Sequence, residues 1–142
     1  MSFNILIVDD SSAMRSIIKK AIKISGFDVG QIYEAGDGRE ALSVLDTSWV
    51  DLVLTDINMP NMNGLELIDE MKRDELMKEI PVVIISTEGS EKRIKEAKER
   101  GVKGYIKKPF LPSDIKKILN EIMGVDGYGK EAMDSGDEEF DF

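Results

Sequence analysis

The sequence predicts a doubly wound α/β domain, in which a five-stranded parallel sheet is covered by helices on both faces. Short runs rich in Ile, Val and Leu alternate with helical patterns along the whole body of the chain, as in parallel sheets with crossover helices. Two of these runs, ending at residues 8 and 55, are followed directly by aspartate. Because ligands bind beyond the carboxyl ends of parallel strands, these aspartates are candidates for a functional site.

Five apolar runs have the length and composition of buried strands. They cover about residues 5–8, 31–34, 52–55, 82–85 and 104–106. The helical segments between them are long enough for right-handed crossovers, which are the usual connections between parallel strands.

Five helical patterns follow the strands. The first should begin near Ser11-Ser12, which are good N-cap residues, and stop at Gly26. The fifth should start at Pro112, since proline is common in the first turn of a helix. The second to fifth helices are expected over about residues 39–45, 64–74, 91–100 and 112–122.

Composition excludes several classes of function. The 142 residues suit one domain with a single core, and no apolar run is long enough to cross a membrane. The chain has no cysteine, which excludes disulfides and favours a cytoplasmic location, and no histidine, which excludes imidazole chemistry and most zinc sites. A net charge of -9 argues against DNA binding.

The acidic residues are concentrated near the C-terminus. Residues 124–142 contain seven acids and one base, whereas the first 123 residues carry a net charge of only -3. Three glycines between Gly124 and Gly129 mark a boundary. We therefore predict a folded domain over residues 1–123 and an acidic tail over residues 124–142.

Four of the five predicted strands end in polar or charged residues at the same edge of the sheet. A single acid at a strand end is usually a cap or a loop residue, but this combination is harder to dismiss. Three carboxylates in one place repel one another unless a cation or protons neutralise them. The residues are Asp9 and Asp10 after the first strand, Asp56 after the third, Ser86 and Thr87 after the fourth, and Lys107, Lys108 and Pro109 after the fifth.

This set of groups suits phosphoryl transfer to a carboxylate. Mg²⁺, or Mn²⁺ in its place, binds through carboxylates and phosphate oxygens. An ionised aspartate can act as a nucleophile and form an aspartyl phosphate. The phosphoryl oxygens then need further positive charge and hydrogen-bond donors, which Lys108 and Ser86 can supply.

In this order and spacing, the residues resemble the motif of response-regulator receiver domains. The motif is Asp9-Asp10, Asp56, Ser86 and Lys108-Pro109, and the resemblance covers residues 3–123. The segment 56–67 is especially similar to stand-alone, CheY-like receivers of the chemotaxis type. The resemblance implies a flavodoxin-like receiver fold with strand order 2-1-3-4-5.

The resemblance also implies roles for the matching residues. Asp56 would accept the phosphoryl group, Ser86 and Lys108 would contact it, and the Lys108-Pro109 bond would be cis. Magnesium would be held by Asp10 directly, by Asp9 partly through water, by Asp56 and by the backbone carbonyl of Asn58.

Four further positions correspond to sites that change or tune the activity of the family. Tyr105 matches the aromatic residue that, with Ser86, forms the activation switch; otherwise it is a simple edge-strand aromatic. Asn58 and Glu88 match positions that tune dephosphorylation. Thr87 stands where close relatives often have Ala or Gly, and its branched side chain could narrow access to the site.

The implied function is that of a stand-alone response regulator. A histidine kinase would supply the phosphoryl group, and an output protein, such as a flagellar switch or another effector, would bind the activated surface; a phosphatase is a further candidate partner. The chain would act only on its own phosphorylation and so is not expected to be an enzyme otherwise. We expect a monomer, with a dimer left open.

Two alternative functions remain open. One is a phosphorelay intermediate that passes its phosphate to a histidine phosphotransfer protein. The other is a phosphohydrolase with an aspartyl nucleophile, which is disfavoured because such enzymes commonly carry an acid two residues after the nucleophile, where this chain has Asn58.

Basic residues cluster around the fourth helix, fifth strand and fifth helix. They form either an ordinary solvated surface or a docking surface for an acidic partner. The acidic tail, near Asp134–Phe142, could occupy that surface itself or remain a solubilising end. The basic residues are Lys92, Arg93, Lys95, Lys98, Arg100, Lys103, Lys107, Lys116 and Lys117.

Overall fold

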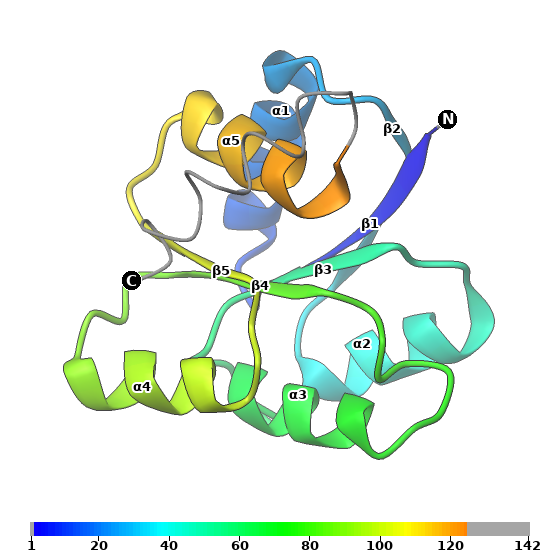
Figure 1. Ribbon diagram of the computed structural model, residues 1–142, viewed down its shortest axis with the longest axis vertical. Coiled ribbons are helices and arrows are strands. Elements are labelled where there is room, and N and C mark those ends of the chain that lie inside the picture. Colours follow the sequence, from blue (N-terminus) through cyan, green and yellow to red (C-terminus); the bar gives the residue numbers. More distant parts are fainter. Residues whose placement is uncertain (1, 125–142) are drawn as a thin grey trace.

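The computed structural model describes residues 2–124, and its five parallel strands form one sheet in the order β2-β1-β3-β4-β5 (Figure 1). Both the fold class and the strand order agree with those expected. The acidic tail, apart from Gly124, lies outside the described residues, so the choice between a contact with the basic surface and a solubilising end is not tested. The strands are β1 (Phe3–Val8), β2 (Val29–Ala35), β3 (Leu52–Thr55), β4 (Val82–Ser86) and β5 (Gly104–Lys107).

Helices cover both faces of the sheet. On one face lie α1 (Ser12–Ser25) and α5 (Pro112–Met123); on the other lie α2 (Gly38–Thr47), α3 (Gly64–Lys72) and α4 (Glu91–Glu99) (Figure 1). Within residues 2–124, no helix is long and apolar enough to cross a membrane.

The core is divided into two layers by the sheet. Along β1, Ile5 and Ile7 pack on the side of α1 and α5, whereas Leu6 and Val8 pack on the side of the other three helices. Successive side chains of a strand point to opposite faces, so a strand that is apolar at every position can fill both layers. This explains why the strands read as continuous apolar runs rather than as alternating patterns.

The helix ends follow the predicted signals. The Ser11 hydroxyl accepts a hydrogen bond from the backbone N–H of Met14, and Gly26 ends α1 with a left-handed backbone, at φ 80°. At α3, Asn63 and Glu66 form a reciprocal capping box. Each of these contacts satisfies backbone groups that lack partners at a helix end.

Four strands (β1, β2, β4 and β5) are longer than predicted, because pairing with a neighbour decides where a strand ends. β2 begins at Val29, which pairs with Phe3, although the apolar pattern began only at residue 31. β5 continues to Lys107, which pairs with Ser86. Hydrogen bonding to an adjacent strand thus extends the ladder beyond the residues that the apolar pattern alone includes.

The third helix is shorter than predicted. It ends at Lys72 rather than near residue 74. The Asp74 carboxylate accepts hydrogen bonds from the backbone N–H groups of Leu76 and Met77, at 2.7 and 3.1 Å. Such local bonds compete with continued helix and turn the chain towards β4.

Candidate functional site

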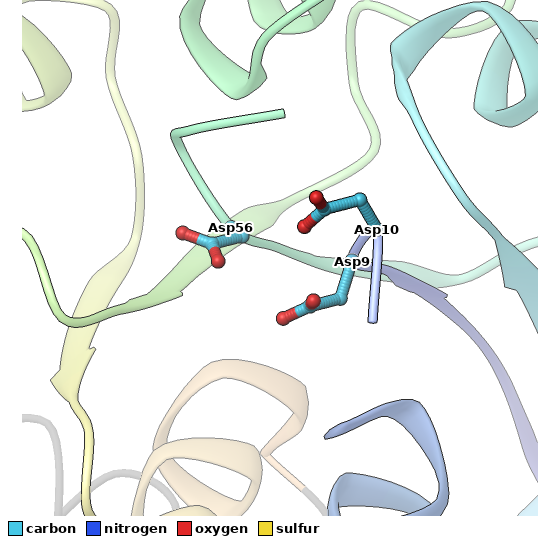
Figure 2. Close-up of side chains that lie close together, drawn as sticks. All are labelled: Asp9, Asp10 and Asp56. Carbon is cyan, nitrogen blue, oxygen red and sulfur yellow. The ribbon is translucent and has the colours of Figure 1, made fainter. Parts of the chain in front are cut away.

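The carboxyl ends of β1 and β3 meet at one edge of the sheet. Val8 pairs with Thr55, and the backbone N–H of Asp56 donates to the carbonyl of Val8 at 2.9 Å. Figure 2 shows the side chains of Asp9, Asp10 and Asp56 gathered at this edge. Each offers a carboxylate oxygen within 4.8 Å of the others, so the expected convergence of three carboxylates is confirmed.

The three carboxylates differ in burial and in their partners. Asp9 is 2% exposed, and its Oδ1 accepts the backbone N–H of Ser11 at 2.9 Å. Asp56 is partly buried, and its Oδ1 accepts the backbone N–H of Ile57 at 2.6 Å. Asp10 is exposed. Asp10 is therefore the carboxylate most available to a ligand from solvent.

Lys108 bridges the two inner carboxylates. Its ammonium group lies 2.8 Å from Oδ2 of Asp9 and 3.0 Å from Oδ2 of Asp56, and its side chain is 9% exposed. Burial opposes the charge on this amine, but hydrogen bonds and attraction from Asp9 and Asp56 outweigh it and raise the pKa of Lys108. The lysine is thus held protonated between two anions.

The turn after β5 brings this lysine back to β4. The backbone N–H of Lys108 donates to the carbonyl of Ser86 at 2.9 Å. The Lys108-Pro109 peptide bond is cis, as expected. Ser86 and Lys108, at the ends of β4 and β5, therefore lie at the same edge of the sheet as the three carboxylates.

Ser86, Glu88 and Tyr105 form a connected set beside the carboxylates. The buried Ser86 hydroxyl accepts the backbone N–H of Glu88 at 3.1 Å, and the Tyr105 hydroxyl donates to the backbone carbonyl of Glu88. Burial, together with the charges of Glu88 and Asp56, raises the pKa of Tyr105 to about 12. Tyr105 is therefore a half-buried, neutral donor to the loop that follows Ser86, and not a free edge-strand aromatic.

Two side chains meet across the outer part of the site. The amide of Asn58 donates to Oε1 of Glu88 at 3.4 Å, and this bond, followed by those from Ser90, lowers the pKa of Glu88. Thr87 is exposed at the end of β4. Residues two positions beyond Asp56 and Ser86 thus contact each other, which the sequence spacing alone did not reveal.

A glycine and an arginine that sequence reasoning did not assign to the site help to build it. A Cβ atom on Gly64 would lie 2.1 Å from the carbonyl oxygen of Asp56, so only glycine lets α3 begin so close to the end of β3. The Arg15 guanidinium donates to the backbone carbonyl of Asp9 at 2.7 Å and pairs with Glu34 at 2.9 Å. The Asn63-Gly64 pair at the start of α3 is a sequence signal that could have identified the glycine. No feature of the sequence pattern distinguished Arg15.

The donor set fits a hard divalent cation. Asp9, Asp10 and Asp56 offer only oxygen ligands, as Mg²⁺ prefers, and no other cluster of this kind occurs between residues 2 and 124. The backbone of Asn58 lies in the loop that directly follows Asp56. These residues could hold magnesium, with open positions left for phosphate oxygens.

The basic residues around α4, β5 and α5 are mostly exposed, but not all are available. Arg93 pairs with Glu96 at 3.3 Å, and Arg100 pairs with Asp69 at 3.0 Å. Lys92, Lys95, Lys103, Lys107 and Lys116 are exposed. The surface is therefore less strongly basic than the sequence count indicates.

Comparison with known proteins agrees with this geometry. Residues 5–120 match the family model described as the response regulator receiver domain. The chain is 43% identical over 121 residues to chemotaxis protein CheY-3 of Vibrio cholerae, covering 85% of this chain and 92% of that protein. It is 41% identical to chemotaxis protein CheY1 of Helicobacter pylori, covering 84% and 96%.

Solved structures give the same result. The structure of V. cholerae chemotaxis protein CheY4 superposes with a TM-score of 0.77 at 30% identity, covering 86% of this chain and 99% of that one. The phosphorylated cyanobacterial phytochrome response regulator RcpA superposes with a TM-score of 0.71, also at 30% identity, covering 86% and 91%.

Proposed function

Because this chain belongs to the response regulator receiver domain family and has CheY-like relatives, we propose that it is a chemotaxis response regulator switched by phosphorylation of Asp56. The observation that carries this proposal is the position of Asp56, held between a protonated lysine and two further carboxylates. The phosphorylated relative RcpA, which shares the fold at 30% identity, supports it.

The reaction transfers a phosphoryl group from a phosphohistidine of a histidine kinase. A carboxylate oxygen of Asp56 forms the new P–O bond while the P–N bond to the donor imidazole breaks, and the bonding electrons leave with the imidazole. The N–H of Ile57 and the ammonium of Lys108 orient the Asp56 carboxylate for this attack. The chain would act only on itself, in phosphorylation and dephosphorylation.

Mg²⁺ bound by Asp9, Asp10, Asp56 and the Asn58 carbonyl would neutralise charge on the phosphoryl oxygens. The protein groups supply the rest of the stabilisation. Lys108 is already charged and aimed at Asp56, so it can move with little reorganisation to a phosphoryl oxygen. The Ser86 hydroxyl accepts a bond from the backbone N–H of Glu88, and its own proton can be donated to a phosphoryl oxygen.

The set formed by Ser86, Glu88 and Tyr105 provides a route from the site to the surface. If Ser86 moves to donate to the phosphoryl group, the loop at Glu88 moves with it, and Tyr105 loses or changes its acceptor. The surface of α4, β5 and α5 changes as a result, and the output partner, a flagellar switch protein or another effector, binds the changed surface. Exposed lysines there favour an acidic partner segment.

The test is phosphorylation by acetyl phosphate with Mg²⁺, followed by intact-mass measurement. Wild type should gain one acid-stable, base-labile phosphoryl group, and Asp56→Asn should gain none. Label mapping to a serine or threonine would overturn the mechanism. Repeated turnover of a stable phosphate ester would point instead to a phosphohydrolase, and transfer onward to a histidine phosphotransfer protein would point to a phosphorelay.

A further inference from the structure

An apolar groove lies at the end of the sheet opposite the carboxylates. It is formed between the segment that joins α2 to β3 and the segment that joins α3 to β4, which lie at the same end of the sheet (Figure 1). The groove has a volume of about 560 Å³. Trp49 and Leu76, which are 77% and 88% exposed, stand along it, and Ile80 and Pro81 also line it.

The groove is held in shape by hydrogen bonds to β1. The indole N–H of Trp49 donates to Oδ1 of Asp51 at 3.1 Å, and Oδ2 of Asp51 accepts the backbone N–H of Asn4 at 2.8 Å. The amide of Asn4 donates in turn to the carbonyl of Trp49 at 2.9 Å. An exposed tryptophan that is fixed in this way loses little entropy on binding, which is a property of anchor residues in interfaces.

The charges lining the groove have one sign. Asp46, Asp51 and Glu79 line it, and no lysine or arginine does. Within residues 2–124 none of these three carboxylates forms an ion pair, and Lys78 on the same segment is already paired with Glu75 at 2.7 Å. The negative potential in the groove is therefore not neutralised by the described part of the chain.

The neighbouring hollow has the opposite character. It measures about 270 Å³, shares Met77, Glu79, Ile80 and Pro81 with the groove, and is also lined by four bases, Lys72, Lys78, Arg100 and Lys103. Asp46 and Asp51 line only the groove, whereas Glu79 lies between the groove and this basic hollow. A basic ligand has a reason to bind over the groove and a reason to avoid the neighbouring hollow.

We propose that the groove between Trp49 and Leu76 is a docking site for a basic peptide segment of a partner protein, with apolar side chains as anchors. The anchors pack against Trp49 and Leu76, and the flanking bases face Asp46, Asp51 and Glu79. Apolar burial supplies affinity, and the unpaired carboxylates select the sign of the partner's charge. The site is separate from the phosphoryl acceptor, because Asp51 precedes β3 and Asp56 follows it.

Trp49 is the only tryptophan in the chain, so its fluorescence reports on the groove directly. The probe is the synthetic peptide Lys-Arg-Phe-Leu-Lys-Arg, with Glu-Asp-Phe-Leu-Glu-Asp and Lys-Arg-Ser-Ser-Lys-Arg as counterparts. The first should give a saturable blue shift of Trp49 emission. Each counterpart should bind at least about tenfold more weakly, because one has the wrong charge and the other lacks the anchors.

Variants locate the binding. Glu79→Lys and Leu76→Asp should each weaken binding of the first peptide by about tenfold or more. The first substitution removes a negative charge from the groove, and the second removes an apolar side chain. Glu99→Lys on α4 and Leu111→Asp before α5 make the same changes at exposed positions elsewhere and should alter affinity by no more than about twofold. Asp56→Asn should also leave affinity unchanged, which separates this proposal from the phosphorylation switch.

Absence of a saturable shift with the basic apolar peptide would overturn the proposal. Equal affinity for the acidic peptide, or an equal loss in Glu99→Lys, would do the same. A blue shift that grows with protein concentration alone, with a dimer in sedimentation that Leu76→Asp abolishes, would show that a second copy of the chain occupies the groove instead.

Discussion

The ammonium group of Lys108 lies 3.0 Å from the Asp56 carboxylate, although 52 positions separate the two residues in the chain. The same ammonium lies 2.8 Å from Asp9. One buried cation is therefore shared by two of the three carboxylates at the site. It stabilises the cluster, and it also competes with any metal ion that binds there.

Replacing this lysine should have opposite effects on stability and on metal binding. Lys108→Met leaves Asp9 and Asp56 without their cation, so the free energy of unfolding without metal should fall by about 1–3 kcal/mol. Mg²⁺ should bind more tightly, by about fivefold, because removing a nearby like charge is worth about 1 kcal/mol. Denaturant unfolding and calorimetric titration measure the two effects.

The control for this experiment is Lys107→Met. Lys107 is exposed and directly precedes Lys108. Its replacement removes the same charge without removing a contact with the carboxylates. This control should change neither the free energy of unfolding nor the affinity for Mg²⁺ appreciably. If both variants bind Mg²⁺ more tightly by the same factor, the effect arises from net charge. The prediction that Lys108 competes specifically with the metal is then wrong.

The two adjacent aspartates should respond differently to substitution. Asp10→Asn should weaken Mg²⁺ binding by about tenfold or more with little change in stability, because Asp10 is exposed. Asp9→Asn should weaken Mg²⁺ and also lower stability by about 1–3 kcal/mol, because Asp9 is buried against Lys108. Calorimetry is the suitable measurement, since Trp49 lies at the opposite end of β3 and is a poor reporter for the metal. Unchanged Mg²⁺ affinity in both variants would contradict the assignment.

Gly64→Ala should disturb the phosphoryl acceptor through the backbone. The new Cβ would lie 2.1 Å from the Asp56 carbonyl oxygen, so either β3 or the start of α3 must shift, at a cost of about 1–3 kcal/mol. Phosphorylation by acetyl phosphate should slow at the same time. In Gly36→Ala the nearest atom is a flexible Glu40 carboxylate oxygen at 3.4 Å, so this control should lose little of either.

Alkaline pH should weaken the bond between Tyr105 and Glu88. The folded-state pKa of Tyr105 is about 12, above the ordinary value of 10.0, so the neutral hydroxyl is favoured by folding. Its contribution is complete below about pH 10 and is lost as the pH rises from 10 to 12. The ultraviolet difference titration between wild type and Tyr105→Phe should show a tyrosine ionising near pH 12. A midpoint near 10 would contradict the burial of the hydroxyl close to the charges of Glu88 and Asp56.

The prediction from sequence succeeded best where a pattern is local. The run from residue 52 to residue 55 was predicted with its observed ends, because all four residues are buried and the flanking residues are polar. The starts of α1 and α5 followed from Ser11 and Pro112, whose effects on the backbone extend over only a few residues. β1, β2, β4 and β5 were predicted too short, because their end residues are ordered by hydrogen bonds to neighbouring strands and not by a local apolar pattern.

By itself, the sequence determined the alternation of strands and helices, the fold class and the residue types at the strand ends, because apolar periodicity and caps act within a few residues of the chain. Three features depend on the tertiary structure: Lys108 bridges Asp9 and Asp56, Tyr105 bonds the backbone of Glu88, and Trp49 and Leu76 line one groove. These contacts join distant segments, and their geometry depends on the register and packing of the whole sheet. A spacing along the chain carries no information about that geometry.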